Sequence, residues 1–198
     1  MTNIEKLELS VRDLYGAKDP ARDDWADWLA ANHVFAVADS AQEVAEQHGA
    51  RADLARAGGM LHDIADARMS RFDEAHEETS LAIARDLMQQ AGFSEEEIHI
   101  VVDDGIRLHS CRDGQAPETP EGKALATGDA RVHLQSDFYL YFAWKKGTEG
   151  KSLEELKQIV GKKIERDFHD KIFFEDVRET CRPAYELLRI WAEPAPNQ

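Results

Sequence analysis

The sequence is poor in cysteine and has no long hydrophobic run. Cys111 and Cys181 are its only cysteines in 198 residues, too few for a disulfide framework and too isolated for a thiolate zinc site. No apolar run approaches the roughly 20 residues that cross a bilayer. The first residues do not resemble a signal peptide. We therefore expect a protein of the reducing cytoplasm that does not enter a membrane.

Positive charge is also scarce. Lysine and arginine number 24 against 39 aspartates and glutamates, for a formal net charge of -15. Such a surface repels phosphate backbones and acidic lipids, which argues against nucleic acids and membranes as partners. A small anionic substrate can still bind at a local positive centre such as a metal ion. With 42% hydrophobic and 32% charged residues, the chain is expected to be globular.

Sustained alternation of apolar and polar residues, the mark of a half-buried strand, is absent. Apolar residues recur instead at helical spacing. The expected helices cover residues 3–15, 23–49, 51–65, 74–91, 95–109, 120–144, 153–164 and 173–191. Pro183 should kink or interrupt the last of them. We predict an all-α helical bundle, one domain over residues 1–198, long enough to bury a core.

Capping residues mark the start of several expected helices. Asp73 precedes one helix, Ser94 and Glu97 form a capping box, Thr119 stands before Pro120, and Ser152 precedes another helix. Short polar side chains at these positions accept hydrogen bonds from free N–H groups of the first turn. They fix where the helices begin.

The chain is organised around Gly58-Gly59-Met60-Leu61-His62-Asp63-Ile64, in which an imidazole and a carboxylate end an apolar segment. Neighbouring helix residues point about 100° apart, so both can hold one ion only near a helix end or between helices. Four more potential ligands fall on inward faces of other expected helices: His33, His76, His109 and Asp129. A lone inward histidine is usually an ordinary core residue. Six such groups together would need six separate partners, whereas one or two divalent metals satisfy them all.

The types of donor limit which metals can bind. Imidazoles and carboxylates suit iron, manganese, cobalt, nickel or zinc. The lack of thiolates and the presence of more than four ligands argue against a closed structural zinc site. Six ligands suit two octahedral ions, and the two oxygens of Asp63 can be shared between them.

These residues carry a family resemblance. His33, then His62-Asp63, then Asp129 resembles the H…HD…D signature of the HD superfamily of metal-dependent phosphohydrolases, and His76 and His109 match the extra histidines of its dinuclear H…HD…H…H…D members. The similarity covers about residues 25–145, including Leu-His-Asp-Ile and Glu-Gly-Lys-Ala-Leu-Ala-Thr-Gly-Asp-Ala-Arg.

The resemblance implies roles for these residues. His33, His62, Asp63 and Asp129 would hold a first metal, and Asp63, His76 and His109 a second, with His62 and Asp63 as the catalytic pair. The chain has Asp66 three residues after Asp63, where many relatives place a lysine or a second aspartate. Residues 146–198, with helices at about 152–192, lie outside the resemblance and are assigned to packing or to a homo-oligomer interface.

The implied chemistry is hydrolysis of a phosphoester or phosphoanhydride bond in a nucleotide or small phosphorylated metabolite. Metals would activate water and neutralise developing charge. Arg68 and Arg71, in the loop after the His-Asp pair, and Lys123 and Arg131, on either side of Asp129, are candidate phosphate-binding side chains. Solvated surface cations explain all four equally well. His133, one turn after Asp129, either orients a ligand or packs in the core.

Two other functions fit the same ligands. Similar six-ligand HD sites occur in diiron oxygenases, which cleave carbon–carbon or carbon–phosphorus bonds of small molecules. Activity that persists with manganese or cobalt in the absence of oxygen would exclude that chemistry. A non-catalytic domain that binds a nucleotide is the third interpretation, and ligand binding that survives loss of metal would favour it.

Overall fold

The computed structural model describes residues 1–193, and all regular secondary structure in that part of the chain is helical. The α-helices are α1 (Asn3–Gly16), α2 (Ala26–Leu29), α3 (Phe35–Gln47), α4 (Ala52–Leu61), α5 (His76–Ala91), α6 (Glu95–Ile98), α7 (Pro120–Gln135), α8 (Phe138–Thr148), α9 (Leu153–Arg166) and α10 (Glu175–Ala192). Three π-helical segments, η1 (Ala30–Val34), η3 (His99–Ile106) and η4 (Asp167–Lys171), and one 3₁₀ turn, η2 (Ile64–Ala67), complete the fold. The predicted all-α class is confirmed.

Most of the expected caps are present. Ser94 with Glu97 and Ser152 with Glu155 form complete capping boxes, and the Thr119 hydroxyl accepts from the Gly122 N–H. The prediction for Asp73 is wrong, because α5 begins only at His76. Its carboxylate accepts instead from the Ala75 N–H at 2.8 Å. A short acidic side chain can close such a local turn ahead of the helix.

Two expected helices differ from the structure. The stretch 120–144 is divided, because Ser136 has extended backbone (ψ -175°) and ends α7 before α8 starts. The last helix, in contrast, runs from Glu175 to Ala192 without interruption at Pro183. Pro183 and Glu179 are both exposed, so the carbonyl that loses its N–H partner can bond to water.

Two glycines allow helices to approach closely around α3. A Cβ atom on Gly59 of α4 would lie 2.5 Å from the Ala38 Cα, and one on Gly128 of α7 would lie 2.6 Å from the Ala41 N. Any side chain there would force the helices apart. The end of α4, the middle of α7 and the segment before α3 therefore meet in the interior.

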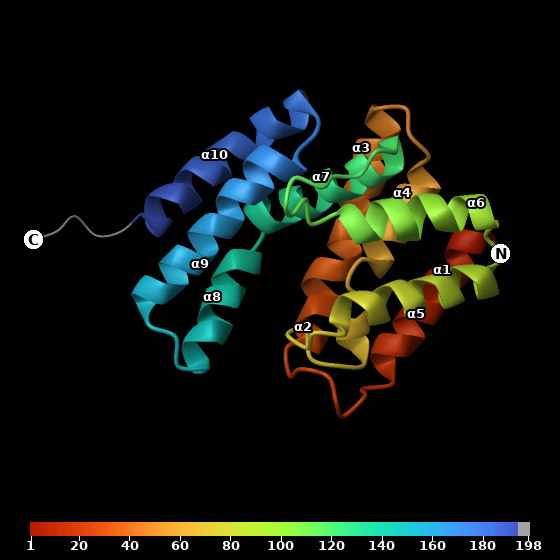
Figure 1. Ribbon diagram of the computed structural model, residues 1–198, viewed down its shortest axis with the longest axis horizontal. Helices are drawn as coiled ribbons and strands as arrows, with labels where there is room; N and C mark the ends of the chain where they lie inside the picture. Colours follow the sequence, from red (N-terminus) through yellow and green to blue (C-terminus); the bar gives the residue numbers. More distant parts are fainter. Residues whose placement is uncertain (194–198) are drawn as a thin grey trace, which may run out of the picture.

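Two hydrophobic clusters stabilise the fold. One joins α1, α3, α4, α5, η3 and α7, and the other joins α3 and α7 to α8, η4, α9 and α10. Figure 1 shows α8, α9 and α10 grouped at one end of the molecule, with α7 leading toward them from the other helices. No helix within residues 1–193 is long and apolar enough to span a membrane. That the whole chain forms one domain stays a prediction.

Candidate metal centre

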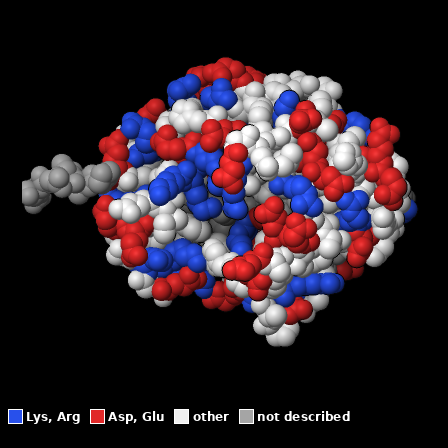
Figure 2. All heavy atoms as spheres, in the orientation of Figure 1, with Lys and Arg blue, Asp and Glu red and all other residues white. Residues whose placement is uncertain are grey.

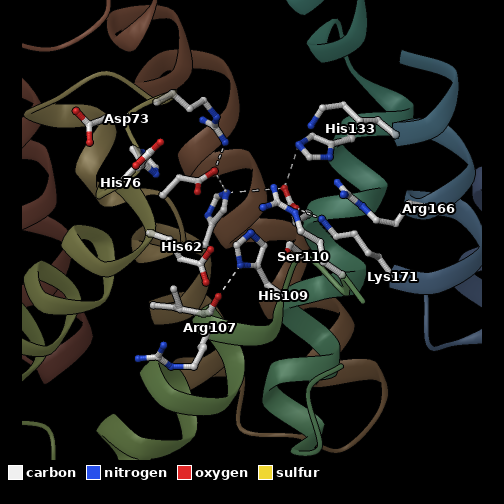
Figure 3. Close-up of a pocket in the computed structure, with 17 residues that line it drawn as sticks. His62, Asp73, His76, Arg107, His109, Ser110, His133, Arg166 and Lys171 are labelled. Atoms are coloured by element: carbon white, nitrogen blue, oxygen red, sulfur yellow. Dashed lines mark hydrogen bonds and ion pairs between the residues drawn. The ribbon is translucent and has the colours of Figure 1, made fainter. Parts of the chain in front are cut away.

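A cavity of about 330 Å³ opens between the α4–α5 side of the molecule and the C-terminal helices. Lysine and arginine side chains gather around a hollow on the face of the molecule that Figure 2 shows. Histidine and aspartate side chains from helices far apart in the sequence line the cavity, among them His62, His109, Asp129 and His133. Figure 3 shows His62 and His109 between Asp73 and His76 on one side and Arg166 and Lys171 on the other.

Three buried side chains form a group that can hold a metal ion. His33, His62 and Asp129 each offer one donor atom, and these atoms lie within 4.8 Å of one another. They come from η1, the end of α4 and the middle of α7. The Nε2 atoms of the two histidines are 3.3 Å apart. This convergence matches three of the six ligands predicted from the sequence.

The end of α4 presents His62 in a form suited to metal binding. The helix stops at Leu61, and Asp63 already has non-helical backbone (φ -129°, ψ 36°). At this helix end the two side chains approach each other, with Nε2 of His62 3.5 Å from Oδ2 of Asp63, as the sequence required for both to reach one ion. The Nδ1 atom of His62 lies 2.8 Å from the Gly59 carbonyl oxygen. A hydrogen bond donated from Nδ1–H leaves the Nε2 lone pair directed toward the cluster.

The carboxylate of Asp129 is the negative centre of the group. Its Oδ1 is buried without a hydrogen-bond donor and lies 3.6 Å from Nε2 of His33 and 3.8 Å from Nε2 of His62. Burial opposes ionisation, but His133 and Lys171 hold the pKa of Asp129 well below its usual range. An ionised oxygen without a donor, facing imidazole nitrogens, is a site that a divalent cation fits.

Two histidines at or next to the cavity, His33 and His109, are suited to act as neutral ligands. Burial, reinforced by the neighbouring His133, lowers the pKa of His33 well below its usual value. Burial and then the charge of Lys171 lower the pKa of His109 to about 4. Nδ1 of His109 lies 2.6 Å from the Ile106 carbonyl oxygen, which leaves Nε2 free. At neutral pH both rings carry available lone pairs.

Two other predicted ligands, Asp63 and His76, are paired with side chains outside the three-donor group. Arg71 contacts the Asp63 carboxylate directly and also donates to Asp66 at 2.5 Å. Burial opposes ionisation of Asp63, but Arg71 and then His62 keep its pKa far below the usual range. His76 Nε2 lies 2.9 Å from Asp66 Oδ1. Burial lowers the pKa of His76, but this bond together with the charges of Asp63 and Asp66 raises it above its usual value. Asp63 thus pairs with Arg71 while its Oδ2 also lies 3.5 Å from Nε2 of His62, and its bridging role stays a prediction.

Asp66 holds Arg71 and His76 in their positions. It is 3% exposed and accepts from both Arg71 and His76. The sequence showed Asp66 only as a departure from the family pattern. In the structure it fixes the positions of two side chains that line the cavity.

His133 lies beside the three-donor group. Its Nδ1 is 2.8 Å from Asp167 Oδ2, and its Nε2 is 3.2 Å from Asp129 Oδ1. Its ring stacks 5.0 Å from that of His33. Of the two roles considered from the sequence, orientation fits this geometry, because His133 is held by Asp167 and lies between the carboxylates of Asp167 and Asp129.

Only one of the four predicted phosphate-binding cations reaches the cavity. Arg71 lines it, whereas Arg68, Lys123 and Arg131 are not among its lining residues in the described chain. Arg68 is exposed, and Arg131 pairs with Glu43 at 2.9 Å. These three cations are near Asp63 or Asp129 in the sequence, but their side chains do not point toward the cavity, because successive helix residues face different ways.

The C-terminal helices contribute side chains that the sequence did not reveal. Lys163 and Arg166 of α9 and Lys171 of η4 all line the cavity. The assignment of residues 146–198 to packing or an interface did not include this contribution, although α9 and α10 also pack against α3 and α7 in one hydrophobic cluster. The available signal was Asp167 and Lys171, oppositely charged at i, i+4 beside the apolar Phe168.

Fold and site together define an all-helical protein with a histidine–aspartate centre at the base of a cavity. The family model of the HD domain matches residues 30–134, more than half of the chain, and the chain belongs to the HD domain family. Proteins of this superfamily are generally metal-dependent hydrolases that bind divalent metals. Comparisons with curated proteins and with solved structures gave no significant match.

Proposed function

We propose that the protein is a metal-dependent phosphohydrolase that cleaves a phosphoester or phosphoanhydride bond of a nucleotide or small phosphorylated metabolite. The observation that carries the proposal is the buried group of His33, His62 and Asp129 at a cavity with a cationic wall. A metal site and positive side chains in one cavity suit an anionic substrate, although the chain as a whole is strongly acidic.

His33, His62 and Asp129 would hold a divalent ion such as manganese, iron, cobalt, nickel or zinc. Such an ion, when bound, supplies an acidic water molecule and neutralises charge on a phosphoryl oxygen. Hydrogen bonding of His62 to Gly59 keeps its ligand nitrogen directed at the centre. Lys171 contacts Asp129 at Oδ2 and leaves Oδ1 facing the histidines.

Arg71 would orient the substrate. Its guanidinium is held by Asp63 and Asp66 at the edge of the cavity. A guanidinium fixed in this way presents its remaining N–H groups with little loss of side-chain freedom on binding. We therefore assign Arg71, rather than Arg68, to contact with a phosphoryl group.

The test is phosphate release from a panel of nucleotides and phosphorylated metabolites, with manganese, cobalt or iron added and oxygen excluded. We expect metal-dependent hydrolysis of at least one compound, abolished in Asp129→Asn. The matched control is Asp39→Asn, because Asp39 is on α3 outside this cavity and pairs with Arg56 at the surface.

Other outcomes would replace the proposal. Turnover that requires both iron and oxygen would instead establish an oxygenase. Ligand binding without turnover, unchanged when metal is removed, would establish a non-catalytic domain. Hydrolysis that survives in Asp129→Asn would show that the reaction occurs elsewhere.

A further inference from the structure

Three cations of the cavity have no carboxylate partner among the described residues. Arg71, Arg107 and Lys171 each pair with an acidic side chain. Lys163, Arg166 and Arg112 line the same cavity, and no carboxylate within residues 1–193 lies within ion-pair distance of them. In a chain with 39 acidic residues against 24 basic ones, cations without acidic partners at one wall call for an anion from outside the chain.

The side chains on α9 are also partly removed from water. Lys163 and Arg166 are half-buried, and the Nε of Arg166 is buried without a hydrogen-bond partner. Burial lowers the pKa of Lys163 to about 8, and Arg166, Arg71 and Lys171 add to this effect while Asp167 opposes it. Positive groups thus repel one another across the wall, and a bound anion would relieve that repulsion.

The opposite wall has the other sign of charge. Asp73, Glu74 and Glu77 line the cavity near α5 and are exposed. In Figure 3, Asp73 lies on one side of His62 and His109, whereas Arg166 and Lys171 lie on the other. A chain of phosphoryl groups held at the centre would be repelled by α5 and drawn toward α9.

We propose that Lys163, Arg166 and Arg112 form an anion subsite beside the metal centre, and that the substrate carries two or more linked phosphoryl groups. This inference rests on the proposed phosphohydrolase function for the identity of the substrate. The subsite itself is supplied by the loop before α7 and by α9, and α9 lies outside the 30–134 match to the HD domain.

Titration calorimetry with inorganic tripolyphosphate and with orthophosphate tests the subsite. We expect Lys163→Gln and Arg166→Gln each to weaken tripolyphosphate binding about tenfold or more, the effect of losing one charge-assisted contact. Orthophosphate binding should change much less. Lys162→Gln is the matched control, because Lys162 is the neighbouring residue of α9, is exposed and does not line the cavity.

Unchanged tripolyphosphate affinity in the Lys163→Gln, Arg166→Gln double variant would overturn the subsite. An equal loss of tripolyphosphate affinity in Lys162→Gln would also overturn it, because the loss would then reflect only the net charge of the protein. Failure of the proposed function looks different: no hydrolysis by the wild type, with tripolyphosphate still bound through Lys163 and Arg166. Hydrolysis of di- and triphosphates with the same KM in the double variant would retain the function and remove the subsite.

Discussion

The ammonium group of Lys171 contacts Oδ2 of Asp129, so the carboxylate that faces His33 and His62 is held from its other side by a residue 42 positions later in the chain. Both partners are 1% exposed. Lys171 also lies 3.7 Å from Asp167, which in turn binds His133. The C-terminal part of the chain therefore sets the charge balance of the candidate metal centre.

Lys171→Met should strongly destabilise the protein without metal. It leaves two buried carboxylates without their shared cation, and breaking a buried pair in this way costs about 3–5 kcal/mol. An added divalent ion at Asp129 should recover part of the loss. The measurement is urea unfolding with and without manganese, and Lys162→Met serves as control. Equal stability of Lys171→Met and the wild type would show that the contact contributes nothing.

Lys163→Met, unlike Lys171→Met, should stabilise the protein at neutral pH. Because the folded-state pKa of Lys163 is about 8 against 10.5 ordinarily, the unfolded chain binds more protons between these pH values. The stability of the wild type relative to Lys163→Met should therefore rise from about pH 8 to about 10.5, and the variant should be the more stable at neutral pH.

Unfolding curves across this pH range check the Lys163 prediction. Asp167, Arg166, Arg71 and Lys171 are the charges that act on this side chain, and they remain in the variant. A gain in stability together with a loss of tripolyphosphate binding would identify a side chain kept for binding rather than for folding. A variant that is less stable than the wild type at neutral pH would contradict this assignment.

Gly59→Ala should disturb both packing and the metal centre. Its new Cβ would lie 2.5 Å from backbone atoms of α3, so α4 must move, at a cost of about 1–3 kcal/mol. Metal affinity should also fall, because α4 positions His62. Gly161→Ala is the control: its Cβ would meet Ala192 at an ordinary 3.4 Å. Thermal unfolding and metal titration of both variants give the comparison. Unchanged metal affinity in Gly59→Ala would show that the position of α4 does not control metal binding at His62.

His109→Ala tests the number of metals. Because Asp63 is held by Arg71 and His76 by Asp66, we expect a single ion per chain, retained in this variant. Elemental analysis of both proteins decides the question. Two ions in the wild type, falling to one in His109→Ala, would instead establish the dinuclear arrangement that the sequence pattern favours. Asp63 would then have to separate from Arg71, and His76 from Asp66, on metal binding.

The sequence predicted much of the fold because helices depend on local signals. The capping boxes at Ser94 and Ser152 and the cap at Thr119 mark their helices correctly. The π-helical segments were not predicted, since their apolar spacing resembles that of an α-helix. Two of them matter here, because η1 carries His33 and η4 carries Lys171.

The candidate site was predictable where it depends on inward faces of helices. His33, His62 and Asp129 could be chosen in this way, and the structure brings them together. The engagement of Asp63 by Arg71 depends on the course of a loop, and the arrival of Lys163 and Lys171 depends on how distant helices pack. The spacing of Asp167 and Lys171 is a local signal for that pair, but the sequence holds none for the course of the loop or for the place of Lys163.

The most direct test of the account is the metal content of protein purified without added metal, compared between the wild type and His33→Ala. His33 lies in the three-donor group and makes no other hydrogen bond through Nδ1 within the described chain. The account predicts about one divalent transition-metal ion per wild-type chain, with the ion and the hydrolytic activity both lost in His33→Ala. A wild-type protein that takes up no such ion even when it is supplied, or a His33→Ala variant that keeps its full metal content, would contradict it.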